Sequence, residues 1–74
     1  MTSSELGSML KNMYDKAPKG EAVAHIHLFG IKYADEIVKH RYSIPKIVEL
    51  SGIRASFSTE VSKGMKLSKY AVLK

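Results

Sequence analysis

Residues 44–63, with the sequence IPKIVELSGIRASFSTEVSK, decide the fold of this chain. Ser43 is a good helix N-cap, and a proline such as Pro45 is tolerated only in the first turn, so a helix is expected to begin between these two residues. This helix ends at Gly52, because glycine can adopt the left-handed conformation that a sharp exit requires. A further helix opens after Ile53. The stretch therefore predicts two short helices joined by a tight turn.

The two predicted helices each have an apolar inner face, formed by Ile47, Val48 and Leu50 in the first and by Phe57, Val61 and Met65 in the second. The outer face of the second helix is polar and basic, with Arg54, Ser56, Ser58, Thr59, Ser62 and Lys63. Four hydroxyl side chains on one helix lower its intrinsic propensity. Their number is better explained if they contact phosphates or base edges.

The charge of the chain is positive and unevenly distributed. Twelve Lys and Arg residues against seven Asp and Glu give a net charge of +5 in 74 residues. Residues 52–74 contain five of the cationic side chains and only one acidic side chain. A basic C-terminal third suits a polyanion such as nucleic acid. The alternative is a lysine-rich surface that serves only solubility.

Lys63, Lys66 and Lys69 recur every three residues at the end of this region. Gly64 is a candidate C′ residue that would end the second helix. If the helix continued past Gly64, the three lysines would line one face. If the chain turned there, they would form a basic strand or wing that can follow a phosphate backbone.

The rest of the chain is also mostly helical in pattern. Residues 3–16 predict a helix capped by Ser3 or Ser4, with one face formed by Leu6, Met9, Leu10, Met13 and Tyr14. Residues 21–39 fit a helix with a bend at Gly30, or else a strand at residues 24–29 followed by a short helix. Residues 70–73 have strand character.

These patterns predict one all-α domain over residues 1–74, a compact fold of four to five helices that contains a helix-turn-helix near residues 44–63. A variant has a short C-terminal strand. If residues 24–29 were also a strand, the two could pair, and the fold would become winged-helix-like.

Several functional classes are not favoured by the composition. The chain has no cysteine, so neither a disulfide scaffold nor a thiolate site is expected, and a reducing compartment fits. His25 and His27 point apart on a helix and share a face only on a strand. We find neither acid–base spacing nor a nucleophile motif, and we expect no enzyme, no metal, no cofactor and no small-molecule substrate. No apolar run is long enough to span a bilayer, and residues 1–5 lack signal-peptide features, which predicts a cytoplasmic protein.

The stretch Lys46-Ile47-Val48-Glu49-Leu50-Ser51-Gly52-Ile53, followed by a helix rich in Ser and Thr, resembles the helix-turn-helix of small bacterial and phage DNA-binding proteins. It is similar in design to the lac-type repressor headpiece. The whole chain is similar to bacterial proteins described as having a helix-turn-helix-like domain. The resemblance implies that the second helix is the recognition helix. It assigns base reading to Arg54, Ala55, Ser56 and Thr59, and phosphate contacts to Ser43, Ser62 and Lys63.

The sequence departs from that motif at two places. Val48 is larger than the small residue that usually lies where the two helices touch. The inner positions Phe57 and Val61 are shifted by one residue. Either the turn is one residue shorter or the helices cross unusually.

The expected function is sequence-dependent binding of double-stranded DNA, with Lys63, Lys66 and Lys69 providing salt-dependent attraction. Useful affinity requires a homodimer, because one small module contacts few base pairs. The dimer seam is expected on the helix at residues 3–16, at Leu6, Met9, Leu10 and Met13. The alternative is a protein-interaction module, an adaptor or antitoxin-like partner, whose sign would be an exposed Met/Leu patch at residues 6–13.

Overall fold

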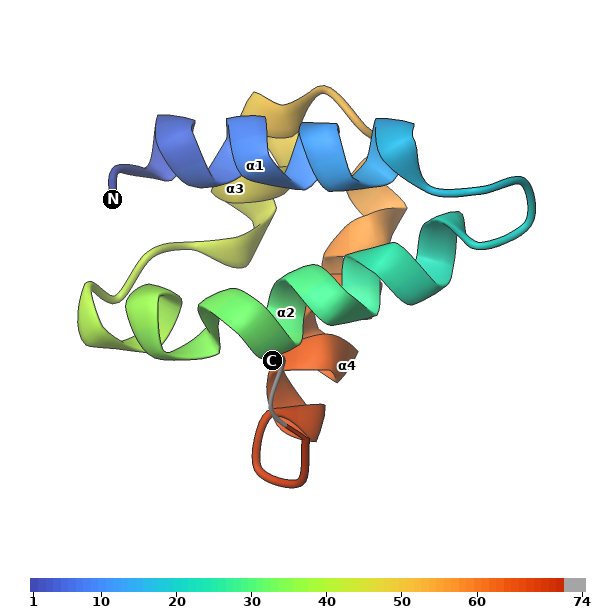
Figure 1. Ribbon diagram of the computed structural model, residues 1–74. Helices are drawn as coiled ribbons and strands as arrows, with labels where there is room; N and C mark the ends of the chain where they lie inside the picture. The colour runs from blue at the N-terminus through green and yellow to red at the C-terminus, as the bar shows by residue number, and fades with distance from the viewer. Residues whose placement is uncertain (72–74) are drawn as a thin grey trace.

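The structure is a computed structural model that describes residues 1–71. These residues form α1 (Ser3–Lys16), α2 (Ala22–Lys39), α3 (Ile44–Ser51), the 3₁₀ turn η1 (Ala55–Phe57) and α4 (Ser58–Leu67), as Figure 1 shows. The prediction of an all-α fold with a helix-turn-helix is confirmed. The described part of the chain contains no strand, and the strand considered at residues 24–29 is wrong because α2 includes them. Tyr70 lies in a turn after α4, and residues 72–73 of the other strand candidate lie outside the described residues.

The helices pack as two pairs around a shared core. α1 contacts α3, α2 contacts α4, and α1 also contacts α2. In Figure 1, α1 and α2 run in opposite directions, and α4 crosses behind α2. Eight apolar side chains from all four helices form the buried core: Leu6, Leu10, Ile26, Phe29, Ile37, Ile47, Val48 and Val61. The two helices of the helix-turn-helix are thus each held by a longer helix.

Local side-chain chemistry sets the start of α1. Thr2 is its N-cap, and the two predicted caps Ser3 and Ser4 lie inside the helix instead. The Thr2 hydroxyl accepts a hydrogen bond from the Glu5 amide at 3.1 Å, and the Glu5 carboxylate accepts one from the Thr2 amide at 2.8 Å. This reciprocal capping box satisfies two amide groups that would otherwise lack partners. The prediction was wrong because it considered only serines as caps and overlooked Glu5, which pairs with the preceding threonine.

The predicted limits of α3 are confirmed. The Ser43 hydroxyl accepts a hydrogen bond from the Lys46 amide at 3.3 Å, and Pro45 lies in the first turn. Gly52 ends the helix with φ +82°. Leu50 does not belong to the inner face, because its side chain is 42% exposed. Ser51 is buried instead, and its hydroxyl donates to the Val48 carbonyl at 2.5 Å.

Two glycines, Gly30 in α2 and Gly64 in α4, lie inside helices at the place where the two helices touch. α2 runs through Gly30, as the prediction of helix on both sides of this residue has it, and α4 runs through Gly64, so the candidate helix end at Gly64 is wrong. A Cβ atom at Gly30 would lie 2.6 Å from the Val61 carbonyl oxygen, and one at Gly64 would collide with the His27 carbonyl oxygen. Both positions lack a side chain because the two backbones touch there.

Among residues 1–71, no helix is both long and apolar enough to cross a membrane.

Candidate nucleic-acid interface

The turn between α3 and α4 is longer than the sequence indicated. After Gly52 the chain passes through Ile53 and Arg54, makes the 3₁₀ turn η1, and only then enters α4 at Ser58. A recognition helix beginning at Arg54 is therefore wrong, and so is the idea of a shortened turn. Arg54 and Ser56 are exposed but precede α4. Phe57 is the N-cap residue of α4 and so precedes its first turn.

α4 presents one polar and basic face to solvent. Thr59, Ser62, Lys63 and Lys66 follow the i, i+3, i+4, i+7 spacing that places residues on one side of a helix. Thr59, Lys63 and Lys66 are exposed, and Ser62 is half-buried. Val61 and Gly64 are buried on the opposite side. We call Thr59, Ser62, Lys63 and Lys66 the α4 face.

The start of α3 lies beside the α4 face. Ile44 and Pro45 from α3 and Ser58, Thr59 and Ser62 from α4 line a shared hollow of about 330 Å³. The N-terminal end of a helix carries a partial positive charge, which suits a phosphate. Ser43 caps this end of α3, so the predicted residues Ser43, Ser58, Thr59 and Ser62 belong to one region of the surface.

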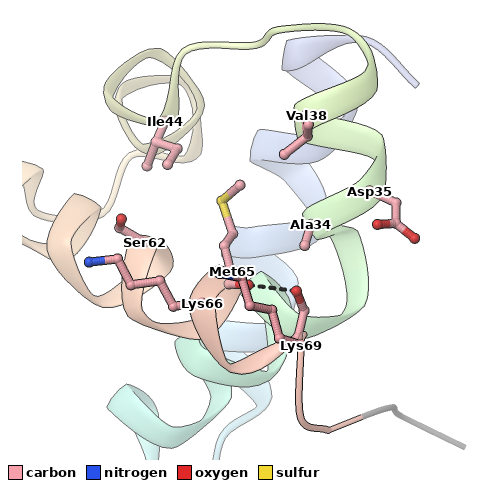
Figure 2. A pocket seen from close by; sticks show the side chains of 9 residues that line it. Ala34, Asp35, Val38, Ile44, Ser62, Met65, Lys66 and Lys69 are labelled. Atoms are coloured by element: carbon pink, nitrogen blue, oxygen red, sulfur yellow. Dashed lines mark hydrogen bonds between the residues drawn. The ribbon is translucent and has the colours of Figure 1, made fainter.

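A second, adjoining groove continues from Ser62 toward the end of α4. Lys66 and Lys69 line it together with Ser62, as Figure 2 shows. Lys66 lies on α4, and Lys69 lies in the turn that follows. The three lysines therefore neither line one continuous helix nor form a strand after Gly64. The helix passes Gly64 and includes Lys66, but it ends before Lys69.

The single acidic residue of α4 is tied to α2. His27 Nε2 lies 2.8 Å from Glu60 Oε1, and Lys63 Nζ lies 3.4 Å from Glu60 Oε2. The hydrogen bond from His27 is the largest cause that holds the pKa of Glu60 below its usual value, and attraction to Lys63 adds to it. The sequence did not reveal this pair, because 33 residues separate its members. Ile44 and Pro45 were also not among the site residues predicted from the sequence. Their position directly after the N-cap Ser43 could have indicated that they lie in the same region of the surface.

The apolar residues of α1 are not available on the surface. Leu6 and Leu10 are 0% exposed, and Met9 and Met13 are partly buried against the core. The expected dimer seam at these side chains is therefore wrong, since they pack within the chain. The exposed Met/Leu patch that would indicate a protein-interaction module is absent from residues 6–13 for the same reason.

His27 and His40 each lie beside a carboxylate, His27 at Glu60 and His40 at Glu36, the latter at 2.7 Å. Within residues 1–71 no three side chains of the metal-ligating types come together. The predicted site residues that come together form one stretch of surface, made of the start of α3, the α4 face and Lys69 in the turn that follows.

Comparisons with known proteins support this description at the level of the family. The search of curated proteins and the search of solved structures found no match. A family model described as an HTH-like domain matches residues 2–74, which is nearly the whole chain. Together with the helix–turn–helix of α3, η1 and α4, this match shows that the chain belongs to the family of HTH-like domains.

Proposed function

We propose that this protein binds double-stranded DNA with the α4 face in the major groove and acts as a small transcriptional regulator. The observation that carries the proposal is the joint placement of the α4 face and the start of α3 around one hollow. An α-helix fits the major groove of B-DNA, and side chains at i, i+3, i+4 and i+7 reach base edges from one side of it.

The chemistry of the α4 face suits this role. The Thr59 and Ser62 hydroxyls can donate or accept hydrogen bonds at base edges, and Ser58 lies one turn before Ser62 at the edge of the hollow. Lys63, Lys66 and Lys69 are cations for phosphates. The partial positive charge at the start of α3 and the Ser43 hydroxyl favour further phosphate contacts.

Arg54 and Ser56 have a different place in the proposal. Both precede α4, in the turn that leads into it, and both are exposed. From there Arg54 reads a guanine or binds a phosphate beside the groove that α4 enters, and Ser56 binds a phosphate. Arg54→Ala tests this role, since a loss of affinity below about 0.5 kcal/mol would remove Arg54 from base reading.

We further infer that two copies bind a two-fold-symmetric site in the cytoplasm, because one recognition helix contacts too few base pairs for useful affinity. The seam must use a surface other than the buried side chains of α1. Sedimentation of the protein with a duplex gives the stoichiometry directly. A complex with two chains per duplex supports the dimer, and one chain per duplex at saturation contradicts it.

The experiment that tests the proposal is an amide NMR titration with a random-sequence duplex, first at low salt and then near physiological salt. We expect shifts at residues 43, 44, 46 and 54–69 that weaken as salt rises. Thr59→Ala and Ser62→Ala should reduce the shifts, whereas Ser4→Ala on α1 serves as a matched control. The absence of shifts even at low salt would contradict DNA binding.

A further inference from the structure

The groove between α2 and α4 has an apolar floor that DNA recognition does not require. It is lined by Ala34, Asp35, Val38, Ile44, Ser62, Met65, Lys66, Ser68 and Lys69 and has a volume of about 330 Å³. This volume lies within the range of sites that bind small molecules. We call it the α2–α4 groove.

Four apolar side chains from three helices converge in this groove. In Figure 2, Val38 from α2, Ile44 from α3 and Met65 from α4 point toward one space, with Ala34 beside them. Val38 is 67% exposed although it is a large aliphatic residue. Met65 is unbranched and flexible, so it can adjust to the shape of a ligand. These side chains offer contacts for an apolar body rather than for a phosphate.

The polar end of the α2–α4 groove is cationic. Lys66 and Lys69 lie on its α4 side, and within residues 1–71 neither lysine forms an ion pair. Lys46 and Lys63, by contrast, are each paired with a glutamate on their own helix. The one acidic lining residue, Asp35, is directed away from the apolar side chains in Figure 2. A ligand with an apolar body and one negative charge matches this arrangement.

We propose that the α2–α4 groove binds a small organic anion, an aryl or alkyl carboxylate, with its hydrocarbon part on Val38, Ile44 and Met65 and its carboxylate between Lys66 and Lys69. A bound ligand would also affect DNA, because Ser62 and Lys66 belong to both the groove and the α4 face. This second effect rests on the proposed function, whereas binding of the anion does not. The ligand is then an effector that competes with DNA for α4.

The test uses 2-naphthoate as the probe and 2-naphthamide as its uncharged match, titrated into the protein without DNA and followed by amide NMR. We expect saturable shifts at residues 34–38, 44 and 62–69 with a Kd of about 1 mM for naphthoate, which is ordinary for a ligand of this size. The amide should bind about threefold more weakly, because it cannot pair with the lysines. No saturable shift in this groove, or equal binding of the amide, would overturn the proposal.

Variants separate the two halves of the site. Val38→Gln should weaken naphthoate and naphthamide alike, because it removes exposed apolar floor without disturbing the core. The pair Lys66→Ser and Lys69→Ser should erase the preference for the anion. Lys19→Ser, a change of the same kind in the turn before α2, should leave both affinities unchanged. A preference that survives the loss of Lys66 and Lys69 would contradict the assigned carboxylate position.

A final experiment measures DNA binding by the protein saturated with naphthoate. Weaker DNA binding in the presence of naphthoate but not of naphthamide would support the effector role. DNA binding that is unchanged by bound naphthoate would overturn competition and leave the anion site in place. If naphthoate binds and DNA does not, the proposed function fails, while the site stands.

Discussion

Gly30 and Gly64 lie where α2 and α4 cross, and each faces the backbone of the other helix. Glycine in a helix interior ordinarily costs about 1 kcal/mol relative to alanine. The sequence therefore favoured a bend at the first glycine and a helix end at the second. The reason for both residues is a contact between segments about 34 positions apart, which no local pattern contains. The close approach fixes the position of α4, and with it the α4 face.

The first prediction concerns Gly64→Ala. On an exposed helix this change would be stabilising, but here the new methyl group meets the His27 backbone, which cannot move aside as a side chain can. We expect the free energy of unfolding to fall by about 2 kcal/mol, as for overpacking of a tight contact. Urea unfolding followed by circular dichroism measures it. Thr59→Ala, on the exposed side of α4, should change stability by less than about 0.5 kcal/mol.

A stabilised Gly64→Ala variant would show that α2 and α4 are farther apart than the structure has them.

The second prediction concerns the link between His27 and Glu60. The pKa of Glu60 is held below its usual value, so the ionised carboxylate favours the folded state at neutral pH. That stabilisation is present above the unfolded-state pKa and is lost as pH falls through the lower folded-state pKa. We expect Glu60→Gln to reduce the loss of stability on acidification, measured as thermal midpoints from about pH 6 down to about pH 3.

His27→Gln should likewise reduce the loss of thermal stability on acidification, because the hydrogen bond that lowers the pKa of Glu60 would be gone. In the double variant the second change should add little to the first, as expected for two residues that act through one contact. Additive effects of the two changes would mean that His27 and Glu60 act independently on acid stability.

At the level of elements, the limits of α3 could be predicted and the start of α4 could not. Ser43, Pro45 and Gly52 act within one turn of their own positions, so the sequence alone identifies them. The start of α4 at Ser58 follows η1 and Phe57. The centroid of the Phe57 ring lies 5.6 Å from the centroid of the Tyr14 ring on α1. The first residue of α4 thus depends on a tertiary contact that no local pattern contains. This explains why Thr59, Ser62 and Lys63 lie on the second helix as the sequence predicts, whereas Arg54 precedes it.

The third prediction concerns the N-cap of α1. The Thr2 hydroxyl and the Glu5 carboxylate form the capping box, and this contact lowers the pKa of Glu5. Thr2→Ala should lower the free energy of unfolding by about 1 kcal/mol, the usual loss for a removed N-cap. Ser4→Ala, a change of one hydroxyl in the first turn of α1, should have an effect below about 0.5 kcal/mol. Equal losses in the two variants, measured by urea unfolding, would contradict Thr2 as the cap.

At the scale of the whole molecule, the excess of positive charge could be predicted from the sequence, but the ion pairs between particular residues could not. Residues 52–74 are strongly basic in composition. The structure adds that Lys63 is paired with Glu60, whereas Lys66 and Lys69 have no ion-pair partner within the described residues. Two cations without an ion-pair partner therefore lie together at the end of α4, beside the α2–α4 groove. The apolar half of that groove could not be predicted, because it joins residues 34–38, 44 and 65 from three helices.

The last prediction follows from this distribution and concerns the salt dependence of DNA binding. Each lysine that neutralises a phosphate releases condensed counterions, so the affinity falls with salt concentration in proportion to the number of such contacts. Lys66→Ser and Lys69→Ser should each reduce the slope of log K against log salt by about 1. Lys19→Ser, which removes the same charge in the turn before α2, should lower the net charge equally and leave the slope unchanged. Fluorescence anisotropy with a labelled duplex, over a series of salt concentrations, measures the slope. Equal slopes for all three variants would mean that net charge, and not the placement of lysines beside α4, governs the attraction to DNA.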